Sequence, residues 1–529
     1  MNEQYNYDVI VVGAGHNGLI VAAYLAKAGL NVGVIEKNNF IGGSTNTLEV
    51  TLPGFKHDIG GIGHVAILGN PLIVNDELGL LSKYGLKYIT PEIGVANVFA
   101  DNTAIHLSAD VDAACQDIAE FSQHDAEAYK KFITYGQAML PLLGQGMYNA
   151  APPFGMFMHQ LDQSPIGQEL IRFLMMSAWD VASQWFEHPK TMMSAMKFAT
   201  EPMVGPEEKG TGVWLLMMLV TQHVSKSGLP IGGSGALAKA LADCIEANGG
   251  TVRTNSEVTK ILTKGDHAYG VKLASGEEIT ARRAVVSNVD PRLTILKWLD
   301  TGVSADLRDK VSRIAEPSFS GMLQAIALDE MPRYKASDRA QDAMMVEPLP
   351  NDLEDFRSLF DDLRYGKIPQ KGFAPIAVTP TVHDPSRAPE GKHVLYLWHY
   401  VPYFLKDGGP QKWDSIKEDV ADMLLDKYLA YTSNLSRKNV LKRTVFSPLD
   451  HERWNANLIN GAVLGPGSFL YQNFAYRPIP ELGQYKTPVN GLYLCGMSTH
   501  PGASIIGGGR AAAQVIMQDL GLDFDDVVS

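Results

Sequence analysis

The chain has few cysteines and no long apolar run. Its 529 residues include only Cys115, Cys244 and Cys495, with no C-x-x-C pair. Cysteines this few and this scattered argue against a disulfide framework, a zinc site and a paired-thiol redox relay, so we expect no metal centre. The longest apolar run, Val213–Val220, is far shorter than the ~20 residues that a transmembrane helix needs.

An excess of positive charge is also absent. The sequence holds 45 Lys and Arg against 58 Asp and Glu, a net charge of -13. This balance argues against a nucleic-acid partner and against charge-driven adsorption to anionic lipid. It leaves open a peripheral membrane contact through an apolar patch, and a homo-oligomer. Because the N-terminus is polar for seven residues before an apolar strand, we expect no signal peptide and a cytoplasmic location.

The most informative stretch runs from Tyr7 to Glu36. An apolar strand pattern is followed by Gly13-Ala-Gly15-His-Asn-Gly18, a helical pattern closed by Gly29, and a second strand ending at Glu36. In this arrangement the glycines allow a tight turn, close approach to a pyrophosphate and close helix packing. The Glu36 carboxylate can accept a hydrogen bond from a ribose hydroxyl. The helix N-terminus offers free N–H groups to phosphate. We therefore predict a dinucleotide site whose contacts include Gly13, Ala14, Gly15, His16, Asn17, Gly18, Glu36 and Lys37.

Glycines gather at two further places. Gly42-Gly43-Ser44-Thr45 and Gly60-Gly61 follow the acidic strand end, where a backbone could pass close to a flat cofactor or simply make ordinary turns. At the other end of the chain, a strand over 490–496, a glycine-bearing loop and a helix from Arg510 form a second helix N-terminus. Two such ends imply one large cofactor held by both termini of the chain.

The middle of the chain is less specific. Residues 72–222 show mainly helical spacing, with helices expected over 109–132 and 166–185. Short strands are expected over 258–288 as Val258–Thr263, Tyr269–Ala274, Glu277–Ala281 and Ala284–Asn288, and loops and surface helices over 334–370. The helical segment is rich in methionine, which either fills the core or lines an adaptable pocket. Its methionines are Met156, Met158, Met175, Met176, Met192, Met193, Met196, Met203, Met217 and Met218.

The clearest late strand is His393–Val401, which is apolar on both faces and is therefore expected between two layers. His399 lies on it. A histidine in such a strand is more often a buried structural residue than a catalyst, and both interpretations stay open.

Motifs along the whole chain resemble those of phytoene-desaturase-type, or phytoene dehydrogenase-like, flavoproteins of the FAD-linked amine oxidase fold. They are Asp8–Glu36, Gly42-Gly43, Pro53–Asp58, Gly232–Ala238, Asn248–Arg253, Val285–Pro291, Asp450–Arg453, Arg477-Pro478, Thr487–Gly496 and Thr499–Gly502. The resemblance implies an α/β fold: a Rossmann-like FAD-binding domain built from discontinuous segments, a substrate domain with a mixed β-sheet, and a helical subdomain. The implied segments are 1–71, 228–292 and 485–529 for FAD, 72–227 for the mainly helical and substrate part, and 293–484 for the mixed sheet.

The resemblance further implies non-covalent FAD, with its adenine half at the N-terminal motif and backbone contacts from Val258. The flavin ring would lie near Gly496, Met497, Gly502, Ala503, Ile505 and Ile506. The sequence departs from many relatives at Ser44, where an arginine often follows the glycine pair, so a flavin contact from that arginine is not expected here.

These observations predict an FAD-dependent oxidoreductase, a dehydrogenase, desaturase or oxidase that takes hydride from an apolar, isoprenoid-like or aromatic substrate. With a single dinucleotide motif, the electrons would pass to oxygen, a quinone or another acceptor. A base could assist C–H cleavage, and His500, His64 and His399 are the candidates. His500 ranks first, because its loop carries the motif expected beside the flavin. The alternatives are a flavin-dependent isomerase or saturase of carotenoid- or retinoid-type substrates, and a non-enzymatic prenyl-protein or lipid-binding protein. The intact Gly13, Gly15, Gly18 and Glu36 disfavour the last.

Overall fold

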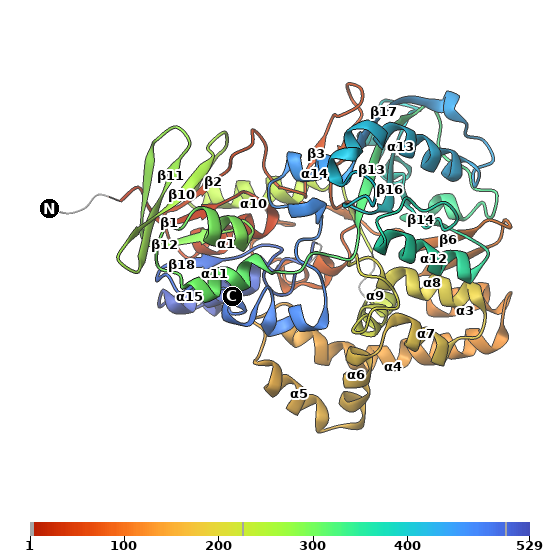
Figure 1. Cartoon of the computed structure of the whole chain (residues 1–529), viewed down its shortest axis with the longest axis horizontal. Coiled ribbons are helices and arrows are strands. Elements are labelled where there is room, and N and C mark those ends of the chain that lie inside the picture. The colour runs from red at the N-terminus through yellow and green to blue at the C-terminus, as the bar shows by residue number, and fades with distance from the viewer. Residues whose placement is uncertain (1–4, 225–226, 503–504) are drawn as a thin grey trace.

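The computed structural model describes residues 5–224, 227–502 and 505–529. Figure 1 shows a first sheet on the side of the N-terminus, a second sheet at the far end, and a lobe of helices beside the second sheet. The first sheet takes its strands from residues 7–35, 251–287 and 492–494, and the second from 93–108 and 320–446. Each half is therefore assembled from segments that are distant in sequence.

The first sheet has the order β10-β11-β12-β1-β2-β9, with β18 paired to β12. Its strands are β1 (Tyr7–Val12), β2 (Val32–Ile35), β9 (Thr251–Arg253), β10 (Val258–Lys264), β11 (His267–Leu273), β12 (Glu278–Ser287) and β18 (Leu492–Leu494). β18, β12, β1, β2 and β9 run parallel, while β10, β11 and the start of β12 form an antiparallel ribbon. The expectation of two strands over 277–288 is wrong. The two form one strand, β12, which continues from the antiparallel ribbon into the parallel sheet.

Helices cover both faces of this sheet. α1 (His16–Lys27), α10 (Gly235–Ala247) and α15 (Gly509–Asp519) pack together in the core that contains Val9 and Val11, while Ile10 and Val12 face the core beside α11 (Ala305–Ser312). A parallel strand buried on both faces is apolar throughout, which explains the continuous run at β1. α1 is buried all round because it lies between the sheet and two other helices.

The second sheet is mixed, with the order β17-β13-β16-β15-β14-β6-β7. Its strands are β6 (Ile93–Phe99), β7 (Ala104–Ser108), β13 (Ser320–Leu328), β14 (Met345–Leu349), β15 (Ile376–Val378), β16 (His393–Val401) and β17 (Val440–Phe446). All neighbours are antiparallel except β14 and β6. The expected strand at 393–401 is confirmed: Trp398 and Tyr400 face one core, and Leu395 and Leu397 face another.

Two expectations for this region are wrong. The segment expected to be mainly helical from residue 72 is not helical over 93–108, because β6 and β7 belong to the second sheet. β6 is buried on both faces, so no alternation marks it as a strand. The stretch 334–370 is more than loops and surface helices, since it supplies β14 as well as α12 (Leu353–Arg364). α12 lies over one face of the second sheet and α13 (Trp413–Leu429) over the other.

The helical lobe follows β7 of the second sheet in the chain and extends to residue 224. It contains α3 (Val111–Ala119), α4 (Gln123–Met147), α5 (Phe154–Asp162), α6 (Pro165–Met175), α7 (Ala178–Trp185), α8 (Pro189–Ala199) and α9 (Gly212–Val224). The two long helices expected here each divide in two. Ser122 accepts a hydrogen bond from the Asp125 N–H, and Ser177 and Asp180 form a capping box, so each serine begins a new helix.

The remaining elements are short. They are the helices α2 (Pro71–Val74), α14 (Pro448–Trp454) and α16 (Asp525–Val528), and the strand pairs β3 (Thr47–Leu48) with β4 (His57–Asp58) and β5 (Tyr88–Ile89) with β8 (Leu229–Pro230). Within the described ranges, every helix is too short or too polar to span a lipid bilayer.

Candidate cofactor and substrate sites

The glycines after β1 are required by close approaches. A Cβ on Gly18 would lie 2.4 Å from the Gly13 carbonyl oxygen, and a Cβ on Gly15 would lie 2.6 Å from the Asn288 side-chain nitrogen. Gly13 itself has a φ of +94°, in the left-handed region. α1 starts directly after Gly15 with no side chain capping its N-terminus. The first N–H groups of α1 are thus available to a phosphate, as the sequence predicts.

Glu36 lies at the carboxyl end of β2 beside this turn. Its buried carboxylate accepts hydrogen bonds from the backbone N–H groups of Ala14 (2.8 Å) and Asn38 (2.9 Å), which hold it against the glycine turn. A cavity of about 340 Å³ opens here. The predicted contacts that line it are Gly13, Gly15, Glu36, Lys37, Gly43 and Val258. The cavity thus joins the pieces predicted to hold the adenine half of a dinucleotide.

The second glycine pair docks onto the first motif. The Gly42 N–H donates to the Ala14 carbonyl at 2.7 Å, and a Cβ on Gly43 would lie 3.2 Å from the Gly15 Cα. Both glycines have positive φ, so the turn and the close approach each require them. Gly42-Gly43 is therefore more than an ordinary turn.

Polar atoms remain unpaired along the same path. Thr45 Oγ1 lies 3.0 Å from His16 Nδ1, while His16 Nε2 and Ser44 Oγ are buried with no hydrogen-bond partner in the part of the chain that the structure describes. Burial lowers the pKa of His16 to about 4, so its ring is neutral at pH 7. Buried polar groups normally have partners, so these residues fit a polar cofactor passing along this path.

The C-terminal loop meets this path from the opposite side. Asn17 Oδ1 accepts the Gly509 N–H at 3.1 Å, which places the start of α15 against the start of α1. Gly496 has a φ of +106°, and a Cβ there would lie 2.6 Å from Asn288 Oδ1. The Met497 carbonyl accepts a hydrogen bond from the Arg477 guanidinium. The two chain ends therefore close on one another, as the motif positions imply.

Close approaches of three further glycines are found in the same region, and that of Gly61 to Ile505 joins the two ends of the chain. A Cβ on Gly61 would lie 2.6 Å from Ile505 Cδ1, and a Cβ on Gly502 would lie 2.3 Å from the Arg477 Nε. A Cβ on Gly60 would meet the Ser44 carbonyl at 2.2 Å. The predicted contact Ala503 lies outside the described residues.

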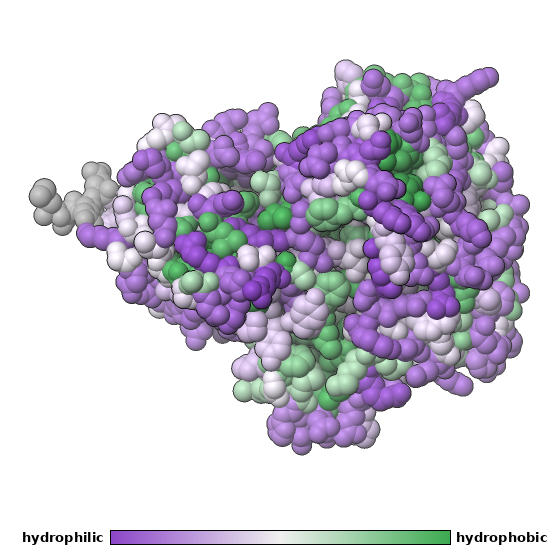
Figure 2. Space-filling model, viewed as in Figure 1, coloured by the Kyte–Doolittle hydropathy of each residue, from purple (hydrophilic) through white to green (hydrophobic). Residues whose placement is uncertain are grey.

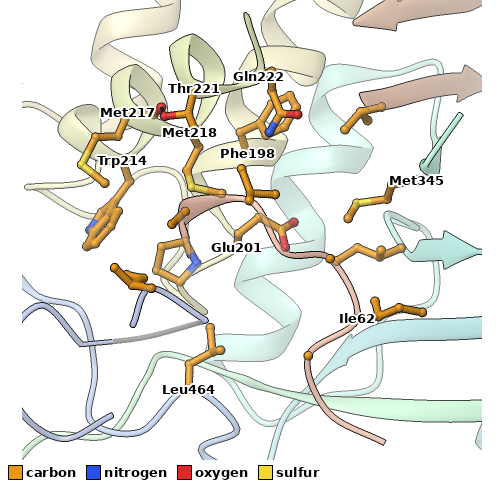
Figure 3. Close-up of a pocket in the computed structure, with 18 of the residues that line it drawn as sticks. Ile62, Phe198, Glu201, Trp214, Met217, Met218, Thr221, Gln222, Met345 and Leu464 are labelled. Carbon is orange, nitrogen blue, oxygen red and sulfur yellow. Dashed lines mark hydrogen bonds between the residues drawn. The ribbon is translucent and has the colours of Figure 1, made fainter. Parts of the chain in front are cut away.

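A large cavity of about 720 Å³ lies between the helical lobe and the second sheet. Ser44, Gly60, Gly61 and Ile506 form its cofactor-side wall. Figure 3 shows its opposite wall, where side chains from α9, from the end of α8 and from the sheet point inward. Apolar residues of this wall include Phe198, Met203, Trp214, Met217, Met218, Met345, Tyr396 and Trp398.

The methionine-rich segment thus serves two purposes. Of the methionines singled out in the sequence, Met203, Met217 and Met218 line this cavity. Others, such as Met193 and Met196, are buried in the core, and Met156 and Met175 are exposed.

A second cavity of about 300 Å³ adjoins the first and shares Met147, Trp214, Met217 and Ile506 with it. Phe157 of α5 and Val213 of α9 also line it. On the face in Figure 2, hydrophobic residues gather over the region where α5, α6 and α9 lie in Figure 1. A peripheral membrane contact in this region stays a prediction.

The three candidate histidines occupy different places. The ring of His64 is held on both sides, at 2.9 Å from the Tyr88 hydroxyl and 3.1 Å from Ser234 Oγ. His399 points to the face of β16 away from the large cavity, where it contacts Gln324 and Phe373. Burial lowers the pKa of both to about 3. Their positions argue against a role as catalytic base.

His500 has a buried ring nitrogen without a partner among the described residues. It lines the second cavity, its Nε2 donates to the Gly146 carbonyl, and Nδ1 is buried with no partner among the described residues. Burial lowers its pKa to about 4. Its catalytic role stays a prediction.

Sequence reasoning missed Glu201, a carboxylate in the wall of the large cavity. The one available signal was the spacing of Lys197 and Glu201, four residues apart at the end of a methionine-rich helix. Such a pair usually marks a solvated surface. Here the packing of α8 against the second sheet buries Lys197 and leaves Glu201 partly exposed to the cavity.

Comparisons with known proteins agree with this geometry. Residues 18–517 match the family described as flavin containing amine oxidoreductase. The rat protein named pyridine nucleotide-disulfide oxidoreductase domain-containing protein 2 is 30% identical, over 97% of this chain and 94% of its own. A limonene dehydrogenase subunit of Castellaniella defragrans is 27% identical, over 99% and 96%. A solved oxidoreductase from Methanosarcina mazei shares the fold with a TM-score of 0.61 and 18% identity, over 96% and 99%.

Proposed function

Because the chain belongs to the flavin-containing amine oxidoreductase family, and is an FAD-dependent oxidoreductase, we propose that it dehydrogenates an apolar, isoprenoid-like or aromatic molecule held in the 720 Å³ cavity. The observation that carries this proposal is the composition of that cavity. One wall is the glycine-rich cofactor path, and the other is built of methionine, tryptophan and phenylalanine side chains.

The two ends of the chain hold FAD. Glu36 would accept a hydrogen bond from a ribose hydroxyl, and the N-terminus of α1 would bind the pyrophosphate. The ring system would lie along the path between Ser44 and Ile506. Bound FAD supplies the acceptor for a hydride. The protein's own residues bind and orient the substrate beside it and exclude water from the cavity.

The apolar wall suits a substrate with little charge. Trp214, Met217 and Met218 project from α9 into the cavity, and flexible thioethers adapt to irregular hydrocarbon shapes. The likeness to a limonene dehydrogenase subunit supports a hydrocarbon substrate of this kind. We further propose that electrons leave to oxygen, a quinone or another acceptor, since the chain has a single dinucleotide motif.

Anaerobic bleaching of the flavin absorbance tests the proposal. Limonene, β-carotene, retinol, p-cresol and cyclohexylamine would each be mixed with the holoprotein, and we expect at least one apolar member to reduce the flavin. Met217→Glu, which places a charge in the cavity, should abolish this reduction. Met175→Glu is the matched control, because Met175 is 62% exposed, and it should leave reduction unchanged.

Failure of every compound to bleach the flavin would contradict the proposal. Conversion of a polyene to a double-bond isomer with no electron acceptor and no net reduction would instead indicate the isomerase alternative. Equal activity of the two methionine variants would show that the substrate binds elsewhere.

A further inference from the structure

A fully buried lysine lies behind the sheet-side wall of the large cavity. Lys197 Nζ is 2.6 Å from Glu201 Oε1, 2.9 Å from Glu347 Oε1 and 2.8 Å from the Tyr400 hydroxyl. An ammonium group has three N–H donors, so each is used once. The surrounding carboxylates raise the pKa of Lys197 well above its usual value, and the side chain stays charged.

The two carboxylates around Lys197 differ in their surroundings. Glu347 is buried, and both of its oxygens are engaged, Oε1 by Lys197 and Oε2 by the Asn97 amide at 2.8 Å. Burial raises the pKa of Glu347. This favours a proton on the cluster, which otherwise has two carboxylates, Glu201 and Glu347, and one ammonium group, Lys197. Glu347 is therefore internally satisfied.

Glu201 is only half satisfied. Its Oε1 accepts from Lys197 and, at 3.0 Å, from the Tyr400 hydroxyl. Its Oε2 accepts no hydrogen bond from any residue that the structure describes, and the side chain, 23% exposed, extends into the cavity beside Phe198 (Figure 3). A carboxylate oxygen facing apolar walls without a donor is costly, so a donor from the ligand would be favoured.

Two other residues of the cavity wall carry buried polar atoms without a partner. The Trp398 indole N–H and His451 Nε2 both belong to residues that line this cavity, and both are buried with no partner in the described ranges. Glu201 Oε2 is thus an unpaired polar atom in a mainly apolar wall, and these two buried atoms lie behind that wall. An apolar wall with few polar groups suits a ligand with one polar end.

We propose that the substrate is an apolar molecule bearing a hydroxyl group, which donates its hydrogen bond to Glu201 Oε2, and that Glu201 takes the hydroxyl proton as the carbinol carbon is oxidised. This inference rests on the proposed function. The O–H bond breaks with its proton passing to Glu201. The C–H bond breaks with its electron pair leaving as hydride to FAD, and the carbon–oxygen double bond forms.

A hydroxyl fits better than an ammonium group. Lys197 is the counter-ion of Glu201, and burial raises the pKa of Glu347, which favours a proton on that second carboxylate. The site therefore lacks one hydrogen bond and does not lack a charge. An ammonium group would bring an additional charge among apolar side chains, where its desolvation is costly. A pure hydrocarbon would leave Oε2 without a donor.

Farnesol and farnesyl methyl ether are a suitable pair of probes, because the ether keeps the chain and loses the donor. Equilibrium dialysis with the holoprotein should give farnesol an affinity at least about tenfold higher than that of the ether, since an unmade hydrogen bond to a partly buried carboxylate costs about that much. Glu201→Gln should remove or reverse this preference, because the amide nitrogen can donate to the ether oxygen. Glu207→Gln is the matched control on the nearby surface, 43% exposed, and should keep it.

The rate of flavin reduction by saturating farnesol tests the proton transfer. Loss of a general base should slow it by about 10²-fold or more in Glu201→Gln. An unchanged rate would overturn the base role.

The binding comparison on unaltered protein decides the inference even if the variant folds poorly. Equal affinity for alcohol and ether would overturn the inference, and bleaching by limonene in the same preparation would leave the proposed function standing. A preference for the alcohol that survives Glu201→Gln would also overturn it. Absence of binding of both probes would do the same.

Discussion

Gly18 packs closely enough against the turn before α1 to make a quantitative prediction. In Gly18→Ala the new methyl group would lie 2.4 Å from the Gly13 carbonyl oxygen, whereas ordinary contacts begin at 3.4 Å. The start of α1 and the glycine turn must therefore separate by about 1 Å, the difference of these two distances. Overpacking of this kind costs about 1–3 kcal/mol.

The same shift would alter FAD binding. The N–H groups at the start of α1 would move relative to the turn that we propose holds the pyrophosphate, and aligned N–H groups at a helix N-terminus bind such anions. We expect FAD affinity to fall at least about tenfold, equivalent to about 1.4 kcal/mol. We also expect the apoprotein to lose about 1–3 kcal/mol of unfolding free energy.

Two measurements check this prediction: the ratio of FAD to protein after gel filtration, and urea unfolding of the apoprotein. Gly155→Ala is the matched control, because Gly155 lies in α5 with nothing within 4 Å of an added Cβ. Alanine there should leave FAD content unchanged and stabilise the helix slightly. Full FAD content together with unchanged apoprotein stability in Gly18→Ala would refute the reasoning.

Two other residues give predictions. The pKa of His64 is lowered from 6.5 to about 3, chiefly by burial. The unfolded chain therefore binds the extra proton below pH 6.5, and stability is lost as the pH falls through this window. Urea unfolding of His64→Gln at a series of pH values should show a smaller slope of unfolding free energy against pH, by about 1.4 kcal/mol per pH unit between about pH 5.5 and 4. An unchanged slope would mean that His64 titrates normally. In Gly321→Ala, the new Cβ would lie 1.8 Å from Trp398 Cζ2 and displace this wall of the large cavity. Substrate-driven flavin bleaching should fall at least about tenfold with FAD content unchanged, because Gly321 belongs to the second sheet; normal bleaching would place the substrate elsewhere.

The cofactor end of the protein could be predicted because its determinants are local. The strand, glycine turn, helix and acid between Tyr7 and Glu36 are contiguous, and each glycine meets a backbone requirement that can be recognised from spacing. The same holds for β16, whose apolar residues on both faces mark a strand between layers. The family membership and FAD dependence expected from these motifs are confirmed.

The boundaries of other elements could not be read in this way. β6 and β14 pair in parallel although about 250 residues separate them, and β6 is buried on both faces, so no local pattern distinguishes it from a helix. The helix breaks at Ser122 and Ser177 depend on capping hydrogen bonds that compete with a continuous apolar period.

Tertiary structure alone decided which polar residues face the substrate cavity. By sequence, Glu201 and Lys197 are an ordinary pair one helical turn apart, and His399 is a histidine on a strand. The packing of α8 against the second sheet buries the lysine beside Glu347 and leaves one oxygen of Glu201 open to the cavity, while the pleat of β16 turns His399 to the other face. Residue spacing was enough to predict the motif from Tyr7 to Glu36, because its strand, glycine turn, helix and acid are contiguous in the chain. The substrate site is built from side chains that only long-range packing brings together.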